Sequence, residues 1–270
     1  MTSFTEHLGR VWREMRLACD IERAAGNLER TALIVTSVGK RPWFDFSLPW
    51  LSLYAKRHNY DLIVRFAPSH KIGPPDEIIN WKYGRLQKLD IREYFNYYSR
   101  LIALDDSCFV SPKTPSLTDI VPEGQLGCVL EENFPLASAR LKEYLEKHQI
   151  VYGLKTPLPR RRLVNSGVLV MGRRHRKLFE FNSGDIEMIL LDPVYADQGF
   201  ISKRAWELNL PIFCLGNEFN FVGSQIAQCG GAEHAPLSIK IFHLTSYLTD
   251  NERVTAAQVI NGRFSAELTN

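Results

Sequence analysis

One short apolar run that ends on two carboxylates constrains the fold of this chain most strongly. Residues 101–104 read Leu-Ile-Ala-Leu, an unbroken hydrophobic run that is typical of buried strands in parallel sheets. Asp105 and Asp106 follow directly, and two adjacent like charges repel each other unless a cation lies beside them. Because ligands bind at the carboxyl ends of strands in open α/β sheets, the acidic pair marks a candidate ligand site. The alternative is a loop whose acids face water or cap the next turn.

The stretches before this run alternate between strand and helix patterns. Residues 31–38 and 60–66 are rich in β-branched and apolar side chains and predict strands, whereas 47–58 and 79–97 predict helices. Such alternation is typical of a parallel sheet with crossover helices. No G-x-G-x-x-G follows the first strand and no G-x-x-x-x-G-K-[ST] occurs, so neither a Rossmann dehydrogenase nor a P-loop protein is indicated.

The second half of the chain adds further elements of both kinds. Residues 163–171 and 238–244 predict strands, while 137–148 and 197–208 predict helices. Gly167 lies inside the first of these strands, where glycine often marks a bulge or a close approach to a ligand. We therefore expect one mixed α/β architecture without internal repeats.

Composition excludes several classes of protein. The 270 residues carry a net charge of +3, and the arginine clusters are short and not interleaved with aromatic residues, so we expect no nucleic-acid partner. The five cysteines are scattered without a C-x-x-C pair, which favours a reducing compartment. No apolar run approaches the roughly eighteen residues of a membrane span, and no signal-peptide pattern is present. We expect a cytoplasmic protein.

The N-terminal segment has its own pattern. Apolar residues recur at three-to-four spacing over 5–28, with arginines between them, which predicts an amphipathic helix. We expect this helix (residues 1–30) to be followed by one domain (residues 31–270). Its apolar stripe is expected to pack on that domain or on a second copy of the chain. A helix lying on a membrane is the alternative, although acids nearly balance the arginines and lysine is absent.

The strand-end acids suggest metal chemistry. Asp105 and Asp106 offer the hard oxygen ligands that Mg²⁺ and Mn²⁺ prefer, and an imidazole ligand favours Mn²⁺. His243 lies near the end of the last predicted strand and is the candidate imidazole. Such an ion commonly takes phosphate oxygens as further ligands, so a phosphate-bearing substrate is the expected partner. The alternative for His243 is a structural histidine.

Several motifs then occur in a distinctive order. They are Val-Thr-Ser after the first strand, a helix with Lys88, Arg-Leu-Ile-Ala-Leu-Asp-Asp-Ser, Asn-Ser-Gly-Val-Leu-Val-Met, Asp-Gln-Gly, Leu-Gly-Asn-Glu-Phe-Asn and Ile-Phe-His-Leu. From about residue 31 to 247, the chain resembles the nucleotide-sugar-dependent glycosyltransferases with the GT-A fold, particularly glycosyltransferase family 8. The resemblance implies a Rossmann-like nucleotide-binding half, with a mostly parallel sheet flanked by helices, fused to an acceptor half.

The resemblance assigns a metal site. Asp105 matches the first acid of the family's D-x-D motif, which contacts the donor ribose and the metal, and His243 matches the histidine that completes the site. Ser107 stands where the second acid is expected. We therefore expect Asp106 to join Asp105 and His243 on a Mn²⁺ or Mg²⁺ ion. A regular strand would instead turn Asp106 to the opposite side, because side chains alternate along a strand.

The resemblance also assigns donor-binding residues. Thr36 and Ser37 match the segment that holds the nucleoside, and Lys88 matches a lysine that faces the donor. Asn165 and Gly167 match the segment that lines the donor-sugar pocket.

Catalytic roles follow from the same resemblance. Asp197 and Gln198 match the pair beside the anomeric carbon. The family's lysine-proline-tryptophan element after the histidine is absent, and the arginines at 160–162 are the expected replacement for neutralising the diphosphate.

The resemblance implies transfer of a sugar from a nucleotide diphosphate sugar, with UDP as the expected nucleotide, to a glycan, lipid-linked or protein acceptor. Two alternatives stay open. Ser107 and the missing tail element would fit a catalytically inactive relative that acts as a binding protein. A sugar nucleotidyltransferase would need a glycine-rich basic loop after the first strand, and residues 37–41 are a poor version of one.

Overall fold

The computed structural model describes most of the chain after the N-terminal segment, namely residues 30–39, 41–66, 84–134, 137–192, 195–245 and 247–269. The predicted N-terminal helix at 5–28 lies outside these ranges. The division of the chain into that helix and one following domain therefore stays a prediction.

The first half forms parallel strands joined by helices. Strand β1 (Thr31–Thr36) pairs in parallel with β2 (Asp61–Arg65) on one side and with β3 (Arg100–Asp105) on the other. Helix α2 (Phe44–Arg57) connects β1 to β2 and begins at Phe44 rather than at residue 47. The described part of the predicted helix at 79–97 is the 3-10 helix η2 (Gln87–Asn96), preceded by a helical turn at 84–86.

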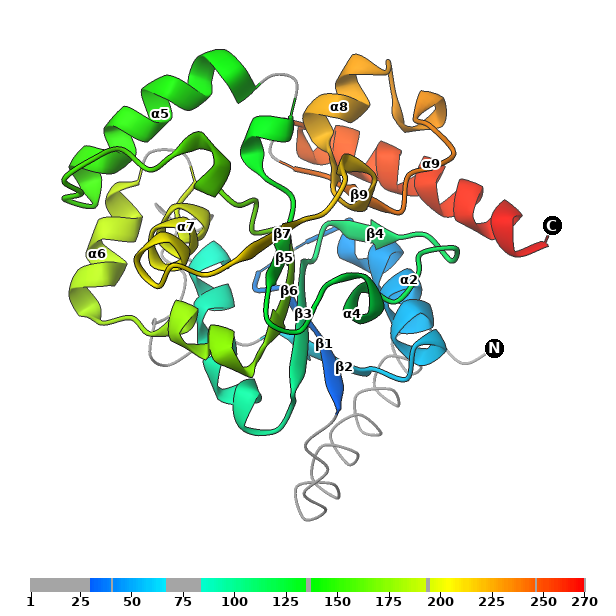
Figure 1. Ribbon diagram of the computed structural model, residues 1–270. Coiled ribbons are helices and arrows are strands. Elements are labelled where there is room, and N and C mark those ends of the chain that lie inside the picture. Colours follow the sequence, from blue (N-terminus) through cyan, green and yellow to red (C-terminus); the bar gives the residue numbers. More distant parts are fainter. Residues whose placement is uncertain are drawn as a thin grey trace.

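The central sheet has six strands in the order β2-β1-β3-β6-β5-β7 (Figure 1). The three strands from the second part of the sheet are β5 (Leu126–Cys128), β6 (Val168–Gly172) and β7 (Ile212–Cys214). Strand β6 runs antiparallel to both of its neighbours, and the other pairings are parallel. The fold is the predicted mixed α/β class with a mostly parallel sheet. The predicted strand at 163–171 is regular only from Val168, because residues 166–167 form a turn.

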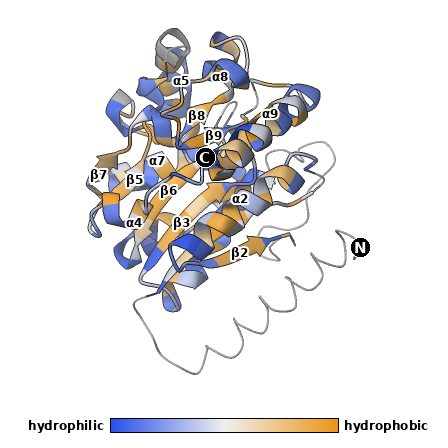
Figure 2. Ribbon diagram, turned by 90° about the vertical axis from the view of Figure 1, so that its right-hand side faces the viewer, coloured by the Kyte–Doolittle hydropathy of each residue, from blue (hydrophilic) through white to orange (hydrophobic). Residues whose placement is uncertain are grey.

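Alternate residues of β1 face two different cores. Ala32 and Ile34 belong to a cluster with η2, α6 (Ser183–Leu191) and α7 (Asp197–Glu207). Leu33 and Val35 belong to a second cluster with α2 and α4 (Leu117–Ile120). Helices therefore cover both faces of the sheet, as a parallel sheet requires. Figure 2 shows the strands as mostly hydrophobic and the outer helices with many polar positions.

A small second sheet lies beside the central one and was not predicted. It has the order β4-β9-β8 and contains β4 (Cys108–Val110), β8 (Phe221–Val222) and β9 (Ile241–His243). It packs with α2, α8 (Gly223–Gln228) and α9 (Asp250–Thr269) around a core rich in aromatic residues. The pairing of β9 with β4 places His243 opposite Cys108. Cys108 follows Asp105 by three residues in the chain, so the pairing brings His243 near the end of β3.

The described ranges also contain a long helix, α5 (Ala137–Val151), and several short 3-10 helices: η3 (Glu131–Asn133), η4 (Arg160–Arg162), η5 (Arg173–Phe179), η6 (Asn217–Phe219) and η7 (Ala232–His234). Within the described ranges, every helix is too short or too polar to cross a lipid bilayer.

Candidate functional site

A cavity of about 700 Å³ opens at the carboxyl ends of β1 and β3. Its wall combines several cations with several carboxylates and a set of tyrosines. The residues that line the cavity include Thr36, Arg41, Trp43, Arg85, Lys88, Asp105, Asp106, Ser107, Glu131, Phe134, Tyr144, Asn165, Ser166, Gly167, Tyr195, Asp197, Gln198, His243, Tyr247 and Arg253. Asp105, the last residue of β3, thus lies at the predicted edge of the sheet.

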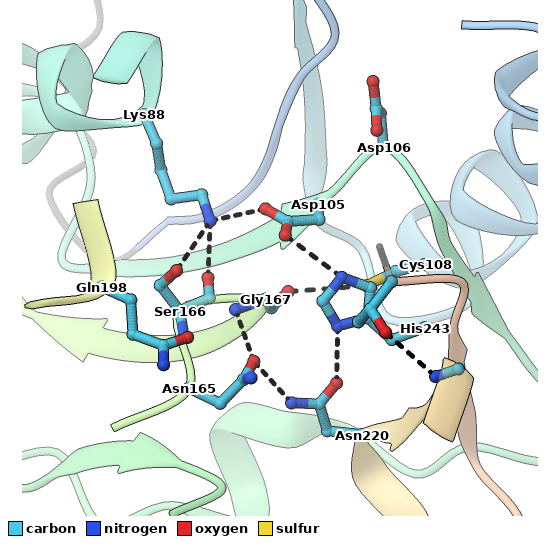
Figure 3. Close-up of polar contacts among 12 residues, drawn as sticks. Lys88, Asp105, Asp106, Cys108, Asn165, Ser166, Gly167, Gln198, Asn220 and His243 are labelled. Carbon is cyan, nitrogen blue, oxygen red and sulfur yellow. Dashed lines mark hydrogen bonds and ion pairs between the residues drawn. The ribbon is translucent and has the colours of Figure 1, made fainter. Parts of the chain in front are cut away.

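Lys88 holds two acids together at the base of this cavity. Its Nζ lies 2.5 Å from Asp105 Oδ1 and 3.4 Å from Asp197 Oδ2, and only 6% of its side chain is exposed. The same nitrogen donates to the backbone oxygen of Ser166 at 2.8 Å (Figure 3). One buried cation therefore joins η2, the end of β3 and the start of α7.

The charges of this cluster shift each other's pKa values. Burial would lower the pKa of Lys88, but the charges of Asp105 and Asp197 outweigh it and raise that pKa. Burial would raise the pKa of Asp105, but the charge of Lys88 and the contact with His243 lower it well below its ordinary value. At neutral pH, Lys88 is therefore cationic and Asp105 is a carboxylate.

His243 approaches Asp105 with a defined ring nitrogen. Its Nε2 lies 3.2 Å from Asp105 Oδ2, and its Nδ1 lies 2.9 Å from Asn220 Oδ1. The amide nitrogen of Asn220 donates to Asn165 Oδ1 at 2.8 Å, so the amide oxygen of Asn220 is the acceptor for His243. Nδ1 therefore carries a hydrogen, and Nε2 is the nitrogen that faces the carboxylate.

Hydrogen bonds continue from Asn165 around the site. Asn165 Nδ2 donates to Glu131 Oε1 at 2.7 Å, and Gln198 Nε2 donates to the same oxygen at 2.8 Å. Gln198 Oε1 accepts from the backbone N–H of Ser166 at 3.2 Å, and Ser166 Oγ donates to Asp197 Oδ2 at 2.8 Å.

These contacts close a circle, which we call the polar ring. Its members are Lys88, Asp105, Glu131, Asn165, Ser166, Asp197, Gln198, Asn220 and His243. Figure 3 shows several of them pointing toward one another from different elements. Because every amide is engaged at both ends, the orientation of each side chain is determined by its neighbours, which preorganises the site.

The turn before α7 orients two members of the polar ring, Asp197 and Gln198. Ala196 has φ 47° and ψ −112°, a conformation that non-glycine residues rarely adopt. Asp192 Oδ1 accepts from the backbone N–H of Tyr195 at 2.9 Å and helps to hold this turn. Asp197 and Gln198 follow immediately, so local strain accompanies their placement toward Lys88 and Glu131.

Asp106 does not join Asp105, contrary to the expectation that both acids reach one ion. Its carboxylate accepts from Trp43 Nε1 at 3.3 Å and lies 3.4 Å from Arg41 Nε. Figure 3 shows Asp106 apart from the cluster of Asp105 and His243. The physical reason is that β3 stays regular through Asp105, so the next side chain points the other way. Burial raises the pKa of Asp106, which the charge of Arg41 only partly offsets.

The two residues predicted to hold the nucleoside, Thr36 and Ser37, also point to different places. Thr36 ends β1 and lines the cavity. Ser37 is buried, hydrogen-bonds the Asp106 carboxylate and is not among the lining residues.

The arginines expected to neutralise a diphosphate come from other parts of the chain. Neither Arg161 nor Arg162 lines the cavity, since Arg161 is 88% exposed beside Glu132 and Arg162 stacks on Trp206. The side chain of Arg160 lies outside the described part. Three arginines that the sequence analysis did not single out line the cavity instead: Arg41, Arg85 and Arg253.

Glu131 and Asn220 were also missed as members of the site. Asn220 belongs to the Leu-Gly-Asn-Glu-Phe-Asn motif, which was noted without a role. Glu131 follows β5 in an ordinary acidic turn, Glu-Glu-Asn, and no local pattern distinguishes it from Glu132. Only the fold shows that Glu131 is buried and Glu132 is not.

Gly167 allows His243 to pack against the backbone. A Cβ atom at this position would lie 2.2 Å from His243 Cε1 and 2.4 Å from its Nδ1. We expect Gly167→Ala to displace the imidazole, to break its contact with Asn220 and to lower the free energy of unfolding by about 1–3 kcal/mol, measured by denaturant titration. Gly262→Ala in α9, where a Cβ meets no atom within 4 Å, is the control and should stabilise by about 0.5–1 kcal/mol. An alanine at 167 that leaves stability unchanged would contradict this packing.

The ligand set for a divalent ion fits in part. Asp105 Oδ2 and His243 Nε2 converge from two strands, and the hydroxyl-bearing Ser107 lines the same cavity. Within the described ranges, however, no three His, Cys, Asp or Glu side chains are grouped to hold a metal. Asp105 Oδ1 is engaged by Lys88. Any ion there would therefore need ligands from a substrate, as diphosphate-bound Mg²⁺ and Mn²⁺ have.

Comparison with solved structures identifies the architecture. The chain has the GT-A fold of glycosyltransferases. It is similar to an active-site mutant of LgtC (TM-score 0.55, 14% identity, 88% of this chain and 95% of that one). It is also similar to a glycosyltransferase involved in glycosylation of the major capsid of PBCV-1 (TM-score 0.53, 12% identity, 85% and 98%). The galactosyltransferase LgtC in complex with donor and acceptor sugar analogs matches as well (TM-score 0.52, 15% identity, 89% and 96%).

At 12–15% identity these likenesses describe the fold. No family model and no curated protein matches the sequence.

Proposed function

We propose that this protein is a glycosyltransferase that transfers a sugar from a nucleotide diphosphate sugar, with UDP as the expected nucleotide. The observation that carries the proposal is the position of the polar ring. Lys88, Asp105, Asp197, Gln198 and His243 lie in one cavity at the carboxyl ends of the strands, where α/β sheets bind ligands. Solved glycosyltransferases share this fold.

The arginines of the cavity supply a site for the diphosphate. The guanidinium of Arg253 lies 4.6 Å from the ring centre of Trp43, and that of Arg41 lies 5.9 Å from the same centre. Burial lowers the pKa of Arg253, Asp250 and Asp106 oppose the fall, and the nearby charges of Arg41 and Arg85 add to it. Arg41 also lies 3.4 Å from Asp106 and Arg253 lies 3.4 Å from Asp250, so each of these two cations shares one carboxylate. Guanidinium groups gathered in one cavity favour a further anion between them, and a departing diphosphate is such an anion.

The polar ring supplies groups for the sugar. Asn165 and Gly167 line the cavity beside Asp197 and Gln198, and all four residues are buried. Neutral amide and carboxylate groups held in fixed orientations can hydrogen-bond sugar hydroxyls without reorganising during the reaction. We assign Asp197 and Gln198 to the region of the anomeric carbon.

A divalent ion would be held by Asp105 and His243 Nε2, with Ser107 as a weak neutral ligand. The imidazole favours Mn²⁺ over Mg²⁺. A bound ion would stabilise the negative charge of the leaving diphosphate as a Lewis acid. The charge of Lys88 lowers the pKa of Asp105 and favours its carboxylate form.

The structural neighbours support the proposal of sugar transfer. LgtC was solved with donor and acceptor sugar analogs, and another LgtC structure carries a mutation of an active-site glutamine to glutamate. Gln198 is the glutamine that the present structure places in the polar ring. By analogy, we propose a glycan as the acceptor of this protein.

The proposal predicts metal-assisted binding of UDP. We expect isothermal titration to show UDP binding in the presence of Mn²⁺. In the presence of EDTA the dissociation constant should rise about tenfold or more, and a tenfold rise corresponds to about 1.4 kcal/mol of binding free energy. GDP and ADP serve as controls for the base. Equal affinity with and without the chelator would remove the metal from the proposal. Absence of binding to all three nucleotides would contradict the donor class itself.

A further inference from the structure

Glu131 differs from the other carboxylates of the cavity in its partners. Asp105 and Asp197 both contact Lys88, and Asp106 contacts Arg41. Glu131 is only 6% exposed, yet across the described ranges no lysine or arginine lies within ion-pair distance of it. Its hydrogen bonds come from neutral groups. A buried carboxylate without a cation costs stability, so its presence beside the reacting groups requires an explanation.

The two oxygens of Glu131 are used unequally. Oε1 accepts from Asn165 Nδ2 at 2.7 Å and from Gln198 Nε2 at 2.8 Å. Among the described residues, Oε2 accepts only a long contact from the Tyr195 hydroxyl at 3.4 Å. A carboxylate oxygen has room for two donors, so Oε2 keeps an accepting position while Oε1 is filled. Glu131 lines the cavity together with its partners Asn165, Tyr195 and Gln198.

The polar ring accommodates Glu131 in either protonation state. When a proton is added to Oε2, Oε1 still accepts from both amides, and no side chain of the ring has to turn. Burial raises the pKa of Glu131, while the hydrogen bonds from Asn165, Gln198 and Tyr195 oppose the rise. A carboxyl group that gains a proton without reorganising its surroundings is suited to general base catalysis.

The surface next to Glu131 is aromatic. Tyr195 contacts Glu131 and packs edge-to-face on Tyr144, with ring centres 4.3 Å apart. Phe134 and Tyr247 line the same cavity. Such a wall offers flat apolar faces and hydroxyl groups together, which suits a sugar ring placed beside the carboxylate.

We propose that Oε2 of Glu131 accepts the proton of the acceptor hydroxyl during sugar transfer. In this step the acceptor oxygen forms a bond to the anomeric carbon as the bond from that carbon to the diphosphate oxygen breaks. The bonding electrons leave with the diphosphate, and the hydroxyl proton passes to Glu131. The proton then leaves to solvent or to the diphosphate, which restores the carboxylate. This role rests on the proposed glycosyltransferase function and adds the base that Gln198, a neutral amide, cannot supply.

The test compares two neighbouring glutamates in the full chain. Glu131→Gln keeps an oxygen for the two amides and replaces Oε2 by an amide nitrogen. Glu132→Gln is the control, because Glu132 lies outside the cavity wall and faces Arg161 at 3.7 Å. The assay measures UDP release from UDP-glucose, UDP-galactose, UDP-xylose and UDP-N-acetylglucosamine with water or free sugars as acceptors. UDP affinity and the melting temperature are measured alongside.

We expect Glu131→Gln to lower UDP release about a hundredfold to ten-thousandfold, with UDP affinity unchanged. Its melting temperature should equal or exceed that of the wild type, because a buried uncompensated charge has been removed. Glu132→Gln should behave as wild type. Formate should restore part of the release to Glu131→Ala by replacing the missing carboxylate.

Three other outcomes would each contradict the role of Glu131 as the base, and they can be told apart. Unchanged release by Glu131→Gln refutes the base role and leaves the proposed function intact. A lower melting temperature together with weaker UDP binding shows that Glu131 is structural. A wild type that binds UDP but releases none from any donor contradicts the base role and sugar transfer together.

Discussion

Replacement of Lys88 by methionine is expected to lower the free energy of unfolding by about 3–5 kcal/mol, as breaking a buried ion pair does. The side chain fills a similar volume, so the loss reflects charge rather than packing. Asp197, whose side chain is 2% exposed, would keep its buried charge without the cation. Lys147→Met is the matched control, because Lys147 pairs with Glu143 at 2.6 Å on an exposed helix face, and such pairs contribute about 0–1 kcal/mol. Denaturant titration measures both variants.

The pH dependence of this effect follows from the two pKa shifts. Asp105 has its pKa lowered from 3.8, so its contribution is present above that value and is lost as pH falls toward the folded-state pKa. Lys88 has its pKa raised from 10.5, so its contribution is present below that value and is lost as pH rises through the folded-state pKa. The penalty of Lys88→Met should therefore be constant from about pH 5 to pH 9 and shrink in stronger acid. A penalty no larger than that of Lys147→Met would show that the Lys88 cluster is not a buried ion pair.

Asp105→Asn is expected to lower turnover by about a hundredfold or more, comparable to removing one preorganised electrostatic group. The amide keeps the shape of the carboxylate but removes the charge that Lys88 and His243 share. Asp106→Asn is the control next to it in the chain. Because Asp106 faces Arg41 and Trp43 rather than His243, its loss should affect turnover less than the loss of Asp105. Equal losses would mean that the two acids act at one ion after all.

Many residues of the candidate site could be selected from the sequence because they follow strong local patterns. The apolar run before Asp105 and the β-branched run before Thr36 identify strand ends, and strand ends of a parallel sheet meet at one edge. Lys88, Asp197 and Gln198 lie on helices whose order along the chain matched a known fold. The contacts among Lys88, Asp105, Asp197 and His243 come from the long-range packing of the elements that carry them.

The rest of the site depends on tertiary contacts that leave no local signal. Glu131 meets Gln198 across 67 positions of sequence, and its neighbour Glu132 reads the same in sequence. Arg253 comes from a C-terminal helix, and only the packing of that helix against Trp43 brings it to the cavity. The side toward which Asp106 points depends on where β3 ends, and a shift of one residue reverses it.

Nucleoside diphosphate release from nucleotide sugars tests the central claim most directly. The wild type is incubated with UDP-sugars and Mn²⁺, beside Asp105→Asn and Asp106→Asn, and free UDP is measured over time. We predict steady release by the wild type, loss of about a hundredfold or more in Asp105→Asn and a smaller loss in Asp106→Asn. Tight UDP binding without any release from UDP-, GDP- or ADP-sugars would contradict sugar transfer and identify a binding protein built on a glycosyltransferase fold.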